Sequence, residues 1–131
     1  MKPIRVFHEY KALFVYGTML SGESNHRYLK GATPLGVRRT EPRYLLVDLG
    51  PYPALMRNGR TAVTGELYLA SAAILRDVDR LEGCPTLFQR ASINLLGGEV
   101  VDSYLLVRAP GLRPPKIRSG DWREHADGSR R

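Results

Sequence analysis

Residues 44–83 read YLLVDLGPYPALMRNGRTAVTGELYLASAAILRDVDRLEG, and their pattern indicates the fold class. It holds three short β-type segments followed by one helical pattern; the β-type segments are 44–48, 54–57 and 62–69. The segments are separated by Gly-Pro-Tyr-Pro and then by Asn-Gly, both of which are typical turn sequences. Strands joined by such turns favour a mostly antiparallel sheet, here followed by a helix.

The helical pattern begins after Ser71, a favoured N-cap residue. Apolar residues then recur along one side of a helix, at Ile74, Leu75, Val78 and Leu81. Gly83 suits the left-handed position after a helix end, and Pro85 prevents continuation. We therefore predict a helix from Ser71 to Leu81.

The rest of the chain adds further extended segments and one short helix ending at Leu29. The extended segments are Ala12–Gly17, Ala32–Thr40, Leu87–Leu96 and Val100–Val107. The whole pattern predicts an α+β fold, with a small, mixed, mostly antiparallel curved sheet or barrel, one well-defined helix and one short helix. We expect a single domain over residues 1–131, with a folded core at 12–107 and a basic surface or partly disordered tail at 108–131.

The composition is that of a globular protein: 131 residues, 43% hydrophobic and 25% charged. No apolar run approaches the roughly 20 residues of a membrane span, so we expect no membrane association. The single cysteine, Cys84, excludes an internal disulfide and suits a cytoplasmic location. The three histidines show no metal-ligand spacing, so we expect no metal site.

The charge of +7 is concentrated at the C-terminal end of the chain. Residues 108–131 hold seven basic and three acidic side chains, which accounts for +4 of the total. A basic tail without a folded basic face makes nucleic acid an unexpected partner. It nevertheless leaves open a non-enzymatic module that binds nucleic acid or an acidic partner through the tail.

Glu82 breaks the local rules of the predicted helix. A carboxylate in the last turn faces the negative end of the helix dipole, and partial burial would also favour the protonated acid. A carboxyl group with a raised pKa suits proton transfer near neutral pH. From the residues alone, an exposed Glu82 paired with Arg80 or Arg90 stays an alternative.

A second candidate site lies where the first predicted strand ends, at Tyr16, Gly17, Thr18 and Met19. Consecutive backbone N–H groups at such a strand end can bind a carboxylate or an oxyanion. An ordinary strand-to-loop transition would leave the same sequence, so this alternative also stays open.

Three motifs in matching order resemble the γ-glutamylcyclotransferase-like family. They are FVYGTMLSGESNH at 14–26, GELY at 65–68 and VDRLEGCPTLFQR at 78–90, and the likeness covers roughly residues 13 to 107. Asn25-His26 looks closest to the γ-glutamylamine cyclotransferase branch. Two residues depart from the family pattern: Met19 replaces the usual leucine and Phe88 replaces the usual tyrosine.

The resemblance implies an enzyme that needs no metal and no cofactor. It would release 5-oxoproline and a free amine from a small γ-glutamyl amine, a γ-glutamyl amino acid or a pathway intermediate. Glu82 matches the family's proton acceptor, and residues 16–19 match the loop that holds the γ-glutamyl group. Deletion of residues 112–131 is expected to spare such an enzyme, unless Trp122 covers the pocket, and to remove most of the salt-sensitive affinity of a tail-binding module. The leaving amine and the oligomeric state are not indicated by the sequence.

Overall fold

The computed structural model describes residues 10–107 and 113–129. Within these residues the strands are β1 (Tyr10–Val15), β2 (Thr33–Arg39), β3 (Tyr44–Asp48), β4 (Pro53–Arg57), β5 (Thr64–Ser71), β6 (Phe88–Asn94) and β7 (Val100–Leu106). The helices are a short 3₁₀ helix η2 (His26–Leu29), α1 (Ala72–Leu81) and α2 (Trp122–Ser129). Each strand predicted from the sequence is present, with ends that move by a few residues.

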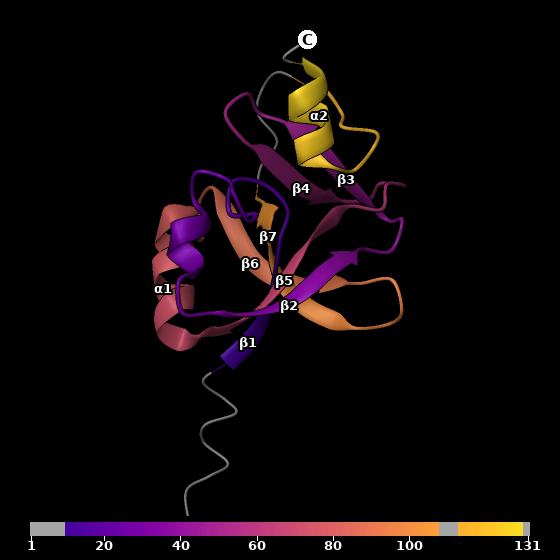
Figure 1. Ribbon diagram of the computed structural model, residues 1–131. Helices are drawn as coiled ribbons and strands as arrows, with labels where there is room; N and C mark the ends of the chain where they lie inside the picture. The colour runs from indigo at the N-terminus through magenta and orange to yellow at the C-terminus, as the bar shows by residue number, and fades with distance from the viewer. Residues whose placement is uncertain (1–9, 108–112, 130–131) are drawn as a thin grey trace, which may run out of the picture.

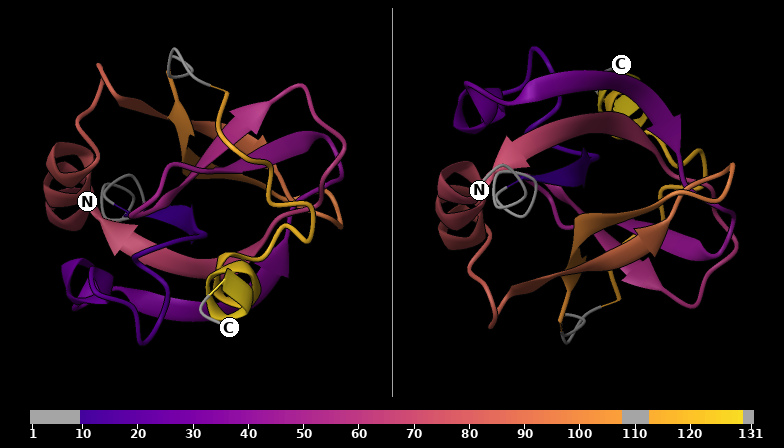
Figure 2. Two further views of the ribbon diagram at one scale, coloured as in Figure 1. Left: turned by 90° about the horizontal axis from the view of Figure 1, so that it is seen from above. Right: turned by 90° about the horizontal axis from the view of Figure 1, so that it is seen from below.

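The strands form one curved and unclosed sheet in the order β2-β5-β1-β7-β4-β3, with β6 paired to β7 (Figure 1). Most neighbours are antiparallel, so the predicted α+β class with a mostly antiparallel curved sheet is confirmed. Figure 2 shows the strands bending around a common interior, with α1 and α2 on different sides of the sheet.

Strand β7 connects the two halves of the sheet by parallel pairing. It pairs with β1 at Leu13 and Asp102, and with β4 at Leu55 and Leu105. Because β6 occupies one edge of β7, β1 and β4 share the other edge. Beyond Leu13, β1 therefore leaves β7, and β4 takes its place beside that strand. Pairings between strands so distant in the chain leave no local sequence signal, so the sequence does not predict them.

Side chains on alternating positions of β1 enter two separate hydrophobic clusters, as the two-residue period of a strand requires. Leu13 and Val15 join a cluster that also contains Leu75 and Val78 of α1. Phe14 and Tyr16 join a second cluster on the other face of the strand. The end of β1 is therefore held on both faces, which fixes the start of the loop that follows it.

Local predictions around α1 are confirmed. The Ser71 side chain accepts a hydrogen bond from the Ile74 N–H at 3.3 Å, and Gly83 has a φ of +67°. Gly65 of β5 marks a close backbone approach, because a Cβ there would lie 2.2 Å from the carbonyl oxygen of Val15.

The expected surface tail must be corrected over its described part, residues 113–129. Ile117 is 2% exposed and Trp122 is 8% exposed, and both belong to the second cluster. Lys116 forms an antiparallel bridge with Val47, so this segment extends the edge of β3 before it enters α2. The basic and proline residues around Ile117 and Trp122 concealed their contribution to the core. Residues 108–112 and 130–131 of the predicted tail lie outside the described residues.

Deletion of residues 112–131 therefore cannot distinguish an enzyme from a tail-binding module, because the cut removes part of the core.

Among the described residues, no helix is long and apolar enough to cross a bilayer.

Candidate active site

A cavity of about 130 Å³ lies where β1 and β4 separate beside β7. It is lined by Phe14, Val15, Tyr16, Gly17, Thr18, Met19, Asn25, Tyr52, Pro53, Leu81, Glu82, Leu87, Phe88 and Tyr104. All five residues selected from the sequence, Tyr16 to Met19 and Glu82, therefore lie around one space. Glu82 is the only acidic or basic side chain among these lining residues.

Tyr16 closes the gap between the diverging strands with its hydroxyl group. The hydroxyl donates a hydrogen bond to the carbonyl oxygen of Tyr104 at 2.7 Å and accepts one from the Leu55 N–H at 3.2 Å. Burial, with a contribution from the nearby Glu82 charge, raises the pKa of Tyr16 well above its ordinary value. The Tyr16 phenol is thus a neutral bridge between strands, and the start of the following loop is fixed by it.

The loop after Tyr16 leaves three backbone donors available. The N–H groups of Gly17, Thr18 and Met19 have no acceptor among the described residues. The loop turns back on itself, because Leu20 N donates to Gly17 O at 3.0 Å and Asn25 N donates to Thr18 O at 2.8 Å. Successive unpaired N–H groups beside a cavity are suited to bind a carboxylate or a developing oxyanion.

Glu82 lies at the C-terminal end of α1 and has a partly buried side chain. Its carboxyl group forms no hydrogen bond and no ion pair with any described residue. Burial without a partner disfavours the charged form, and it raises the pKa of Glu82 to about 7. A carboxyl group in this environment can both accept and donate a proton near neutral pH.

The alternative of an exposed Glu82 paired with Arg80 or Arg90 is wrong. Arg80 instead pairs with Asp77 at 3.4 Å. Arg90 pairs with Asp79 at 3.0 Å and with Asp102 at 2.8 Å, which joins α1 to β6 and β7.

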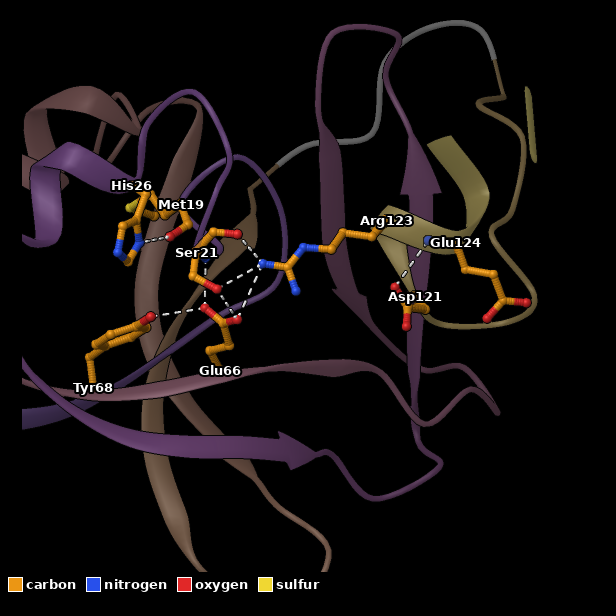
Figure 3. A network of polar contacts seen from close by, with 8 residues as sticks. All are labelled: Met19, Ser21, His26, Glu66, Tyr68, Asp121, Arg123 and Glu124. Carbon is orange, nitrogen blue, oxygen red and sulfur yellow. Dashed lines mark hydrogen bonds and ion pairs between the residues drawn. The ribbon is translucent and has the colours of Figure 1, made fainter. Parts of the chain in front are cut away.

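Glu66 of β5 provides a contrast, because its carboxylate has several partners, among them Ser21 of the same loop (Figure 3). Its carboxylate accepts hydrogen bonds from the Ser21 N–H and hydroxyl, both at 2.8 Å, and from the Tyr68 hydroxyl at 2.9 Å. Arg123 adds an ion pair at 3.2 Å. These partners outweigh the effect of burial and lower the pKa of Glu66 below its ordinary value. Of these two carboxyl groups, Glu66 is held ionised by its partners and Glu82 is free to exchange a proton.

The model for a family described as "Gamma-glutamyl cyclotransferase, AIG2-like" matches residues 13–124. The chain belongs to this family. The match extends well beyond the roughly 13–107 expected from the motifs and includes the start of α2.

Curated relatives in the γ-glutamyl cyclotransferase family support the assignment. A Vibrio cholerae protein named "Putative gamma-glutamylcyclotransferase" is 41% identical over 110 residues, which cover 84% of this chain and 93% of that protein. The "Gamma-L-glutamyl-butirosin B gamma-glutamyl cyclotransferase" of Niallia circulans is 36% identical, over 88% of this chain and 80% of its own. The "Gamma-glutamylaminecyclotransferase" of Homo sapiens is 36% identical, over 79% of this chain and 69% of its own.

A solved member of the AIG2-like group has the same fold. The crystal structure of an AIG2-like protein from Mus musculus superposes with a TM-score of 0.70 at 28% identity. The alignment covers 87% of this chain and 90% of the mouse chain.

Several cavity residues of this family member were not selected from the sequence. Tyr52 and Pro53 looked like ordinary turn residues, and Tyr104 looked like an ordinary strand residue. The Tyr104 hydroxyl donates a hydrogen bond to the Asp79 carboxylate at 2.6 Å, and Asp79 lies one helical turn before Glu82. The Gly-Pro-Tyr-Pro segment forms the turn of the β3–β4 hairpin, so its turn sequence carries no separate signal for the cavity.

Cys84, His26 and His125 do not line the cavity. The Cys84 thiol is partly buried, and burial raises its pKa, so the reactive thiolate is disfavoured. The His26 ring contacts Met19 O at 2.9 Å and the His125 ring contacts Asp48 at 2.8 Å. Trp122 lies in the core and is not among the residues that line the cavity.

Proposed function

We propose that this member of the family is a γ-glutamyl cyclotransferase that releases 5-oxoproline and a free amine from a small γ-glutamyl compound. The observation that carries the proposal is the pairing of an unpartnered carboxyl group, Glu82, with three unpaired backbone donors at residues 17–19 around one cavity. The substrate is a γ-glutamyl amine, a γ-glutamyl amino acid or a pathway intermediate. We further propose a cytoplasmic location, in keeping with the single cysteine.

The size and charge of the cavity support this substrate class. A cavity of about 130 Å³ is smaller than the usual sites for drug-sized ligands, so it accommodates the glutamyl group alone. Because no basic side chain lines it, the substrate carboxylate would be bound by the N–H groups of residues 17–19. The substrate ammonium group would lie toward Glu82. The leaving group would extend past Leu87, which is 45% exposed.

The reaction needs one proton carrier. Glu82 takes a proton from the α-ammonium group, and the freed amine nitrogen attacks the γ-carbonyl carbon of the same molecule. The new C–N bond closes a five-membered ring and leaves an oxyanion on the former γ-carbonyl. Glu82 gives its proton to the leaving nitrogen, the oxyanion collapses and the bond to that nitrogen breaks. The ionised Glu82 then takes the second proton from the lactam nitrogen and passes it to the released amine. Since both reacting groups belong to one molecule, correct folding of the substrate removes much of the entropic barrier.

A panel of γ-glutamyl amines and amino acids, assayed for 5-oxoproline release, tests the proposed function. The proposal expects catalytic turnover of at least one compound in the panel, with stoichiometric release of the amine. A purified and folded chain that releases no 5-oxoproline from any γ-glutamyl compound would contradict it.

The pH dependence of the reaction follows from the pKa of Glu82. Because the free enzyme must hold Glu82 ionised to accept a proton, kcat/KM should fall as the pH is lowered through about 7. The decrease should approach about tenfold per pH unit on the acid side. Initial rates at low substrate concentration measure this profile. An acid limb below pH 4.5 would instead indicate a carboxyl group with a lowered pKa, such as Glu66.

A further inference from the structure

The loop at residues 17–21 needs support from outside the cavity. Its N–H groups at 17–19 have no acceptor among the described residues, so their direction depends on the bonds that hold the neighbouring carbonyl groups, from Leu20 N to Gly17 O and from Asn25 N to Thr18 O. Two side chains of the following segment hold part of it, because Asn25 Nδ2 donates to Thr18 Oγ1 at 3.0 Å and the His26 ring contacts Met19 O at 2.9 Å. The end of the loop, Ser21, is held by other elements.

Ser21 is held by two side chains from different parts of the chain (Figure 3). Glu66 of β5 binds both the Ser21 N–H and the Ser21 hydroxyl. Arg123 of α2 donates to the carbonyl oxygen of Ser21, to its hydroxyl at 3.1 Å and to Glu66 Oε2 at 3.2 Å. Every polar group of Ser21 is thus engaged by a carboxylate and a guanidinium that also bind each other.

Arg123 extends from a firmly docked helix. Its neighbour Trp122 is 8% exposed in the second cluster, and His125 pairs with Asp48 of β3 at 2.8 Å. Asp121 caps the first turn by accepting a hydrogen bond from the Glu124 N–H at 3.2 Å. Because the helix is held in place, the Arg123 side chain loses less conformational entropy when its guanidinium binds the loop. The planar arrangement of the guanidinium donors sets the direction of the hydrogen bonds.

We propose that Arg123 is a positioning residue for the loop at residues 17–21, which it orients together with Glu66 so that the N–H groups of Gly17, Thr18 and Met19 stay directed at the substrate. This inference rests on the proposed function. It assigns the C-terminal segment a part in substrate binding, although Arg123 does not line the cavity. Glu82 lies outside the network, so its proton transfer is expected to be independent of Arg123.

The test compares Arg123→Met with Arg118→Met. Both variants remove one positive charge from the same segment, but Arg118 is exposed and has no hydrogen bond or ion pair with any described residue. Each is assayed for kcat and KM on a γ-glutamyl compound that the wild-type chain turns over. Amide hydrogen exchange at Leu20 and Ser21, whose N–H groups are hydrogen-bonded to Gly17 O and to Glu66, is measured alongside, because it reports loop order without any turnover.

Arg123→Met is expected to raise KM about tenfold, because the loop binds the substrate carboxylate before and during the reaction. It should also accelerate amide exchange at Leu20 and Ser21, and it should leave the acid limb of the kcat/KM profile in place. Arg118→Met should match the wild type in all three. Arg123→Lys keeps the charge and the aliphatic stem, and it should give a KM between those of wild type and Arg123→Met.

Two results would overturn the inference. One is an Arg123→Met variant with the KM and the exchange rates of Arg118→Met. The other is a fall in kcat at unchanged KM. If Arg123→Met does not fold, two single variants replace it, Arg123→Lys and Glu66→Gln. A wild-type KM in both of them would also overturn the inference. Absence of turnover by the wild-type chain would contradict the proposed function instead, and the exchange measurement would still test the inference.

Discussion

Glu82→Gln is expected to reduce 5-oxoproline release by about 10²- to 10⁴-fold, the usual contribution of a positioned acid–base group. Glutamine keeps the size and shape of the side chain but cannot take the proton from the α-ammonium group or return it to the leaving nitrogen. The measurement is kcat for the same γ-glutamyl compound in the variant and in the wild type. A variant that keeps more than about a tenth of the wild-type rate would remove Glu82 from this role.

The same variant carries its own control for folding. The pKa of Glu82 in the folded chain is about 7, against an ordinary value of 4.5, so between these pH values the folded state holds a proton that the unfolded state has released. The free energy of unfolding of the wild type should therefore fall as the pH rises from 4.5 to about 7. Glutamine does not titrate and avoids this loss.

Glu82→Gln should consequently be more stable than the wild type above pH 7, by roughly 1–3 kcal/mol. The Tm difference should be small near pH 4.5 and should grow as the pH rises to about 8. Thermal unfolding of both proteins at several pH values measures it. An inactive variant that is less stable than the wild type at pH 8 would indicate damage to the fold in place of a lost proton carrier.

Gly17→Ala is expected to lower kcat/KM by about 10²-fold, because it displaces the donors that bind the substrate. A Cβ at Gly17 would lie 2.7 Å from Cγ of Pro53, the first residue of β4. The proline ring cannot swing away as a flexible side chain would, so the loop itself must move away from β4. Glu82 belongs to another element, and its pKa and the acid limb of the profile should not change.

Gly128→Ala is the matched control for this substitution. Gly128 lies in α2, is exposed, and an added Cβ would meet nothing within 4 Å. Alanine favours a helix over glycine by about 1 kcal/mol, so this variant should be fully active and slightly more stable. Wild-type kcat/KM in Gly17→Ala would show that the loop at 17–19 does not hold the substrate.

The sequence contained enough local information to predict the fold class and to select the residues of the candidate site. Period-two patterns marked the strands, and Ser71 and Gly83 marked the ends of α1, because these signals depend on neighbours in the chain. Glu82 was selected because a carboxylate at a helix C-terminus conflicts with the helix dipole. The structure adds burial and the absence of a partner, which together raise its pKa.

Features that depend on distant contacts could not be predicted in the same way. Parallel pairing of β7 with β1 and β4 has no local signal, and it creates the gap that Tyr16 bridges. Burial of Trp122 was concealed by the charged and proline-rich residues near it. The network of Ser21, Glu66 and Arg123 joins three segments, the most distant 102 positions apart in the sequence. Such contacts follow from the tertiary fold and cannot be inferred from spacing.

Direct titration of the Glu82 carboxyl group tests whether this side chain has the raised pKa that a proton carrier needs near neutral pH. Carbon-13 NMR of the side-chain carboxyl groups, with Glu82→Gln to assign the resonance, gives its pKa without substrate. We predict a midpoint of about 7, set by burial without a partner. A midpoint near the ordinary 4.5 would mean that Glu82 is a solvated carboxylate, and it would contradict its role as the proton carrier.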